Sequence, residues 1–177
     1  KQEETADPNM ATSDKMIGSS AAWAAGYTGA GSRIAIIDTG ADVDHPSLDP
    51  DALKYALQGS NATIMTEADL TDEVLNQLNA YTRKAGLTAA DFYVNEKIPF
   101  GFNYVDADTD ITHDNDTQGD HGSHVTGIAA GNRFVKDEAG NYVAALDSVM
   151  TQGVAPDAQI LTMKVFGKGG GAYDSDY

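Results

Sequence analysis

The feature that most constrains the fold is a short, unbroken run of β-favouring residues. Residues 33–37, Arg-Ile-Ala-Ile-Ile, do not alternate between polar and apolar side chains, and the run ends at Asp38 and Gly40. Such a run is typical of a strand buried on both faces, as strands of parallel sheets are. Apolar runs at residues 98–105 and 160–166 predict two further strands. We therefore expect an α/β fold built on a parallel sheet with right-handed crossovers.

Segments compatible with helices lie before and between these predicted strands. Residues 16–27 have a short apolar face, and residues 71–86 place their apolar side chains on one face after Thr71, which can cap a helix. Residues 121–130 are rich in Gly and Ala and also fit a helix. The first stretch, residues 1–15, has little to bury and is expected as a loose N-terminal segment.

Composition and charge exclude several classes of function. The 177 residues include 11 Lys and Arg against 27 Asp and Glu, so the formal net charge is −16 and a nucleic-acid partner held through phosphates is not expected. No apolar run approaches the length of about 20 residues that a transmembrane helix needs, so we expect no transmembrane segment in this chain. The absence of cysteine excludes disulfides, thiolate catalysis and cysteine-ligated metals.

Two polar positions are candidates for catalysis. Asp38 directly follows the most apolar predicted strand, and ligands of open α/β sheets bind beyond the carboxyl ends of the strands. A carboxylate there can orient a histidine, although a simple turn aspartate is an equal alternative at this position alone. His121 begins a predicted helix, whose dipole disfavours a protonated imidazole and keeps it able to accept a proton near pH 7. For His124, one turn further along, a packing or capping role is the simpler interpretation.

Three motifs, in this order, resemble those of the subtilisin-like serine proteases, the subtilases. IIDTG at residues 36–40 is similar to the family's aspartate motif, and HGSHVTG at residues 121–127 is similar to its histidine motif. GVAP at residues 153–156 is similar to the segment that leads into the next core strand of the family. The resemblance extends over residues 16–177 and implies a subtilisin-like fold, present as its N-terminal portion.

The resemblance implies a serine endopeptidase that hydrolyses peptide bonds of a protein or peptide substrate through an Asp-His-Ser triad. In that triad Asp38 would orient the imidazole, His121 would be the general base, and a serine would attack the peptide carbonyl. No Gly-Thr-Ser-Met-Ala-like motif for that serine follows His121. We therefore expect the nucleophile on a missing or separate C-terminal remainder of the protease, which would be a partner of this chain.

The resemblance also points to a substrate-binding segment. Gly169, Gly170 and Gly171 are similar in position to the edge segment of the family that pairs with the substrate backbone as an added strand. Glycines there would leave room for bulky substrate side chains. A plain glycine linker is an equal alternative.

An acidic loop, residues 106–120, raises the question of a metal. Asp106, Asp108 and Asp110 match the start of an EF-hand loop, but the glycine and the closing glutamate of that motif are missing, so we reject an EF-hand. Subtilases often bind structural calcium, so the resemblance leaves room for it, although Ser47 stands where calcium-binding relatives carry an aspartate. We expect a solvated charged loop, assign no metal ligand, and expect no cofactor to be required for the chemistry.

The spacing of the motifs points to one group of proteinases within the family. His121 lies 83 positions after Asp38, more than in compact subtilases, and an insertion is expected at about residues 49–96. Together with the sequence VNEKIPFGFNY at residues 94–104, this resembles the lactocepin-type cell-envelope proteinases of Gram-positive bacteria. Members of that group are secreted, multidomain and commonly attached to the cell wall. The resemblance implies an extracellular location, at the cell surface or in association with the cell wall.

Two alternatives stay open at this point. A catalytically inactive, subtilase-like binding or adhesion module would keep Asp38 and His121 and lack the serine. A metallohydrolase would use Asp38 with His121 and His124, since histidines three positions apart can share a helix face, but the sequence contains no HExxH arrangement.

Overall fold

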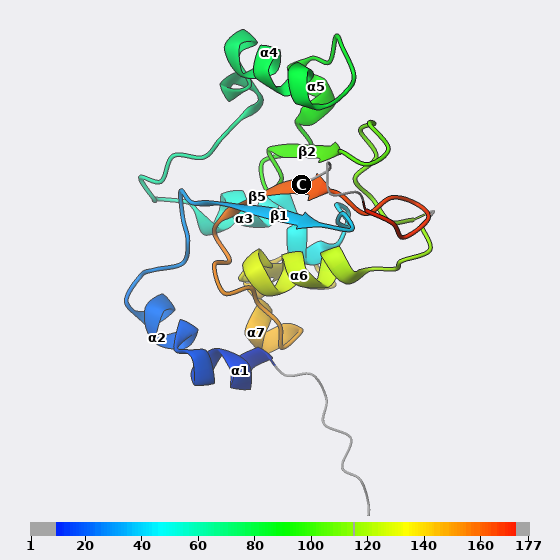
Figure 1. Cartoon of the computed structure of the whole chain (residues 1–177). Helices are drawn as coiled ribbons and strands as arrows, with labels where there is room; N and C mark the ends of the chain where they lie inside the picture. The colour runs from blue at the N-terminus through cyan, green and yellow to red at the C-terminus, as the bar shows by residue number, and fades with distance from the viewer. Residues whose placement is uncertain (1–9, 115, 173–177) are drawn as a thin grey trace, which may run out of the picture.

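A three-stranded parallel sheet lies at the centre of the computed structural model, which describes residues 10–114 and 116–172 (Figure 1). Its strands are β1 (Arg33–Asp38), β2 (Phe100–Asn103) and β5 (Gln159–Lys164), in the order β1-β5-β2. Each strand coincides with a segment predicted from an apolar run. The expected parallel sheet of an α/β fold is therefore confirmed.

The register of the sheet brings three chain segments together at one edge. Asp38 of β1 is the neighbour of Lys164 of β5, and Lys164 is in turn the neighbour of Asn103 of β2. All three are the last residues of their strands. Because parallel strands end on the same side of a sheet, the loops that follow them meet there and can form a site.

Two apolar clusters pack on opposite faces of the sheet, because alternate residues of a strand point to opposite sides. Ile160 of β5 belongs to the cluster on the side of α6 (His121–Ala130), whereas Leu161 and Met163 belong to the other cluster. The second cluster is rich in aromatic rings and includes side chains of α4 (Asp72–Tyr81). The sheet thus has a layer of helix and loop on both sides of β5.

The regular elements within the expected insertion at about residues 49–96 are all helices, and Figure 1 shows part of this segment standing away from the sheet. A small antiparallel hairpin, β3 with β4, lies outside the main sheet and was not predicted. No helix in the described ranges is long and apolar enough to cross a membrane. The remaining elements are α1 (Met10–Ile17), α2 (Ser19–Ala24), η1 (Pro46–Leu48), α3 (Pro50–Ala56), η2 (Glu67–Asp69), α5 (Ala89–Phe92), β3 (Phe134–Lys136), β4 (Tyr142–Ala144) and α7 (Ala145–Ser148).

The N-terminal region differs from the prediction. One helix was expected over residues 16–27, but α1 and α2 are separated by Gly18, whose φ of +84° lies in the left-handed region. Residues 10–15, expected as part of the loose segment, belong to α1, and the hydroxyl of Ser19 donates to a buried carboxylate oxygen of Asp14 at 3.1 Å. This contact fastens α1 to α2. Residues 1–9 lie outside the described residues.

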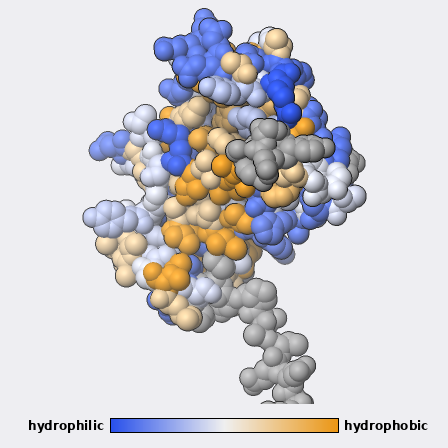
Figure 2. Space-filling model, viewed as in Figure 1, coloured by the Kyte–Doolittle hydropathy of each residue, from blue (hydrophilic) through white to orange (hydrophobic). Residues whose placement is uncertain are grey.

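The prediction that the first strand is buried on both faces is wrong. Ile36 is 7% exposed and belongs to the cluster beside α6, but its neighbour Ile37 is 54% exposed. The reason is topological: β1 lies at the edge of the described sheet, and an apolar run cannot tell which of its faces is covered. Figure 2 shows hydrophobic surface gathered across the middle of the face on which β1 and α6 lie in Figure 1.

Candidate active site

The fold brings Asp38 and His121 together although 83 positions separate them. Nδ1 of His121 lies 2.8 Å from Oδ1 of Asp38. Asp38 ends β1 and His121 is the first residue of α6, so the pair forms where a strand end meets a helix start. The Asp38 side chain is 14% exposed and that of His121 is 70% exposed. The carboxylate is thus shielded while the imidazole stays accessible.

Backbone contacts fix the direction of the Asp38 carboxylate. The backbone N–H of Thr39 donates to Oδ1 of Asp38 at 2.7 Å. The backbone N–H of Val165, directly after β5, donates to the carbonyl of Asp38 at 3.0 Å. Asp38 is therefore held from its own turn and from the neighbouring strand.

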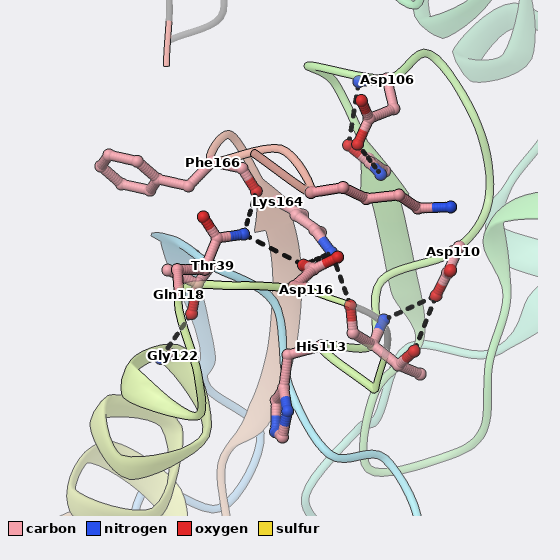
Figure 3. A network of polar contacts seen from close by, with 12 residues as sticks. Thr39, Asp106, Asp110, His113, Asp116, Gln118, Gly122, Lys164 and Phe166 are labelled. Atoms are coloured by element: carbon pink, nitrogen blue, oxygen red, sulfur yellow. Dashed lines mark hydrogen bonds and ion pairs between the residues drawn. The ribbon is translucent and has the colours of Figure 1, made fainter. Parts of the chain in front are cut away.

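Two glycines allow α6 to approach the turn after β1. A Cβ built on Gly122 would lie 2.1 Å from the carbonyl oxygen of Gly40, a distance at which it could not fit. Gly40 has a φ of +102°, which a residue with a side chain rarely adopts. At this close approach the N–H of Gly122 donates to the hydroxyl of Thr39 at 2.8 Å, as Figure 3 shows. The glycines thus set the distance at which His121 meets Asp38.

A second link between α6 and the segment after β1 was not predicted from the sequence. The hydroxyl of Ser123 accepts from the backbone N–H of Asp42 at 2.8 Å and lies 2.9 Å from Nε2 of His113. His113 belongs to the acidic loop, so this link joins three segments. No spacing or composition signal marks His113 in the sequence, because the contact exists only once the loop has folded back onto the helix.

The pKa of His121 is raised from its ordinary value. The hydrogen bond to Asp38 is the largest cause, followed by the charge of Asp38, while partial desolvation works in the opposite direction. The carboxylate of Asp38 thus acts on this pKa in the direction opposite to the one expected from the helix dipole. An imidazole whose Nδ1–H is held by a carboxylate presents Nε2 as a strengthened base, which is the arrangement needed for proton abstraction.

The residues of a metallohydrolase do not converge. Nε2 of His124 lies 3.5 Å from Oδ2 of Asp120, and both side chains are well exposed. Within residues 10–114 and 116–172, no group of three or more acidic or histidine side chains is placed to hold a metal ion. In the acidic loop, Oδ1 of Asp110 accepts from the N–H and the hydroxyl of Thr112, and Oδ1 of Asp108 accepts from the N–H of Asp110. These described carboxylates close turns of the loop.

The segment with three glycines forms a turn after β5. The N–H of Gly170 donates to the carbonyl of Gly167 at 2.8 Å, and the N–H of Gly167 donates to the carbonyl of Gly171 at 3.0 Å. The hydroxyl of Thr117 donates to the carbonyl of Lys168 at 3.0 Å, which holds the turn against the acidic loop. Gly169, Gly170 and Gly171 therefore lie at the carboxyl side of the sheet, in a turn and not in a strand.

Comparisons with known proteins agree with the geometry. Residues 29–177 match the family model described as the Subtilase family. The PII-type and PI-type proteinases of Lactococcus lactis subsp. cremoris are each 34% identical to this chain over 164 residues, which is 90% of this chain and 7% of each relative. The minor extracellular protease Vpr of Bacillus subtilis (strain 168) is 30% identical over 173 residues, 95% of this chain and 14% of Vpr. The chain thus spans a small part of the length of the curated relatives that it matches.

Proposed function

Because this chain belongs to the subtilase family, we propose that it supplies the aspartate and the histidine of a serine endopeptidase. The 2.8 Å contact between Nδ1 of His121 and Oδ1 of Asp38 is the observation that carries the proposal. The nucleophilic serine would lie on a C-terminal part of the protease that is not included in these residues. That part would be the partner of this chain, and the protein or peptide that is cleaved would be the substrate.

The proposed chemistry follows from the orientation of the imidazole. Nδ1–H of His121 donates to Asp38, so the lone pair of Nε2 can accept the proton of the serine hydroxyl as its oxygen bonds to the peptide carbonyl carbon. The imidazolium then gives that proton to the leaving amine as the C–N bond breaks, and a water repeats the sequence to release the acyl group. The carboxylate of Asp38 stabilises the imidazolium. No cofactor is needed in any step.

The turn with Gly169, Gly170 and Gly171 is the proposed place of substrate binding. It follows β5 at the carboxyl end of the sheet, on the side where β1 delivers Asp38, and its glycines leave space beside their backbone groups. Pairing there would hold the substrate by main-chain hydrogen bonds. Gly171→Val should then raise KM in peptide hydrolysis while kcat changes little, and an unchanged KM would argue against this role.

An extracellular location is proposed from the relatives. Vpr is named a minor extracellular protease, and the lactococcal relatives are named proteinases. A cell-surface or cell-wall location of this protein is part of the same proposal. Detection of the protein in the cell-wall fraction of intact cells, accessible to added protease, is the measurement; recovery only from the cell interior would reject it.

The test uses the protease with its serine-bearing part. Asp38→Asn and His121→Ala should each lower kcat/KM by roughly 10⁴-fold or more, because the imidazole loses its orientation or is lost altogether. Labelling of the serine by a fluorophosphonate probe should fall in parallel. His124→Ala, on the same helix and outside the pair, is the matched control and should keep activity.

Near-normal turnover in either variant would reject the proposed roles. A protein that folds but has no serine at the nucleophile position, and neither hydrolyses peptides nor binds the probe, would instead support the inactive binding or adhesion module.

A further inference from the structure

A buried ion pair that the proposed chemistry does not use lies beside the candidate dyad. Nζ of Lys164 contacts Oδ2 of Asp116, and the two side chains are 0% and 2% exposed. Lys164 is the last residue of β5, and Asp116 lies in the acidic loop, five positions before His121. Figure 3 shows this pair with Gln118, whose side chain contacts Asp116, and shows the separate contact between Gly122 and Thr39 in the same view.

The lysine side of the pair is tied to the strand that carries Asp38. Lys164 is the register partner of Asp38 in the sheet, and the N–H of Val165 donates to the carbonyl of Asp38 at 3.0 Å. The side chain of Lys164 then passes the turn after β1, since a Cβ built on Gly40 would lie 3.3 Å from Cδ of Lys164. Movement of Lys164 would therefore disturb both the backbone of Asp38 and the turn against which α6 packs.

The aspartate side of the pair is tied to the loop that delivers His121. Nζ of Lys164 also donates to the carbonyl of Thr112 at 2.6 Å, in the same loop as Asp116. Nε2 of Gln118 donates to Oδ2 of Asp116 and to the carbonyl of Phe166, each at 3.0 Å. The last residues before α6 are thus fastened to the end of β5 at several points.

The start of α6 has no side-chain capping hydrogen bond that would fix its position. Asp120 is its N-cap residue, but the side chain of Asp120 makes no capping hydrogen bond. Helix starts are commonly fixed by such a bond. The position of His121 therefore depends on contacts from outside the helix, namely the close packing of Gly122 on the turn after β1 and the anchored loop.

We propose that Lys164 and Asp116 are positioning residues, which hold His121 against Asp38 by fastening the loop before α6 to the end of β5. A buried ion pair is often no more stabilising than a well-packed apolar pair, so stability alone does not account for it. The geometry of this inference is independent of peptidase activity. Its effect on catalysis rests on the proposed function.

The test separates stability from position by comparing Lys164→Met, Asp116→Leu and the double variant. Each single variant leaves a buried charge without its partner and should lower Tm. The double variant removes one charge of each sign, so it should recover most of the lost Tm and leave the net charge unchanged. Its apolar side chains cannot replace the hydrogen bonds to the carbonyl of Thr112 and from Gln118, so the contact between His121 and Asp38 should remain impaired.

The readout is the pKa of His121 in the 177-residue chain, followed by NMR and assigned with a His121→Gln variant. In the unaltered chain this pKa should lie above the ordinary value of about 6.5. In the double variant it should fall toward the value found in Asp38→Asn, while Asp38 and Asp120, the carboxylates that face the imidazole, are unchanged. Lys54→Met with Glu96→Leu, which removes an exposed pair with a 3.0 Å contact, is the matched control and should leave the pKa as it was.

Each outcome decides the proposal. Recovery of Tm together with an unaltered pKa of His121 in the double variant would overturn it and leave a purely stabilising pair. If the double variant does not fold, Lys164→Arg combined with Asp116→Glu keeps both charges and changes the geometry; a lowered His121 pKa would support the proposal and an unaltered one would overturn it.

The activity measurement is separate from the pKa. In the protease with its serine, the folded double variant should lose at least about tenfold in kcat with little change in KM, because a displaced general base affects the reaction more than substrate binding. If the unaltered protease is inactive while the pKa result holds, the proposed function fails and the positioning role stands.

Discussion

Lys97 places an amino group in the apolar interior. Its side chain is fully buried, and Nζ donates to the carbonyls of Pro156 and Ala158, each at 2.8 Å. Burial penalises the charged form and lowers the pKa of Lys97 to about 7, and the charge of Asp157 offsets only part of this. The lysine fastens the segment before β2 to the segment before β5, at the end of the sheet opposite to the dyad.

This pKa makes the stability depend on pH in a defined direction. Between pH of about 7 and about 10.4 the unfolded chain keeps the proton of Lys97 and the folded chain releases it, so the free energy of unfolding should rise with pH by up to about 5 kcal/mol. Below about pH 7 both states hold the proton and the full penalty of the buried charge applies. Lys97→Met should abolish this rise.

Urea unfolding at several pH values between about 6 and 10 measures the effect. Lys54→Met, at an exposed lysine, is the control and should keep the rise seen in the unaltered protein. Parallel pH profiles for Lys97→Met and the unaltered protein would contradict the assignment of the proton to Lys97.

At the scale of the element, α6 contains two glycines with opposite requirements. A Cβ at Gly122 would meet the carbonyl oxygen of Gly40 at 2.1 Å, whereas a Cβ at Gly127 would have nothing within 4 Å. Gly122→Ala should lower the free energy of unfolding by about 1–3 kcal/mol or more, because α6 must move away from the turn after β1. Gly127→Ala should raise it by about 0.5–1 kcal/mol, because alanine favours a helix.

Chemical denaturation of the two variants checks this prediction, and each serves as the control for the other. Equal effects of the two substitutions would mean that the close approach between Gly122 and Gly40 does not limit the packing of α6.

Elements whose ends are set locally could be predicted from the sequence. The helix expected after Thr71 is α4, and the hydroxyl of Thr71 caps it by accepting from the N–H of Val74, but α4 ends at Tyr81 and not near Gly86 as expected. The helix at 121–130 was also predicted, with His121 as its first residue. The hairpin β3–β4 was missed because its three-residue strands are too short for a periodicity signal. Local patterns define an element, but they do not say which of its faces will be covered.

Part of the candidate site could be predicted from the sequence and part could not. Asp38 and His121 could be found because short motifs surround them, and their expected meeting is what the structure shows. The pair of Lys164 and Asp116 could not be found, since it joins a strand end to a loop 48 positions away and needs the register of the whole sheet. Contacts that depend on tertiary arrangement leave no mark in local composition.

At the scale of the whole molecule, the described residues leave large apolar side chains exposed on and near the edge strand β1. β1 is an edge strand with Ile37 54% exposed, and Ile128 of α6 is 53% exposed. Exposed apolar surface beside an unpaired strand edge favours association. We predict that the chain on its own associates with itself and that Ile128→Lys weakens this association.

Sedimentation velocity over a range of concentrations measures the effect. Tyr81→Lys, at a 77% exposed apolar side chain on α4, introduces the same charge and is the control; it should leave association unchanged. Added salt should strengthen association of the unaltered chain, because it screens the repulsion between copies with a net charge of −16. A chain that stays monomeric at every concentration would contradict the prediction.

The strand order β1-β5-β2 also has a consequence for how the protein is made. Within the described residues β1 pairs with β5 alone. The register partner of Arg33, the first residue of β1, is Gln159. During synthesis the strand that carries Asp38 leaves the ribosome long before β5, its neighbour among the described residues, has been made, and closing so long a loop is slow. Asp38 and His121 are both translated ahead of Lys164, yet the pairing of β1 with β5 that holds Asp38 in register forms only afterwards. This order separates the translation of the two side chains from their assembly into a pair.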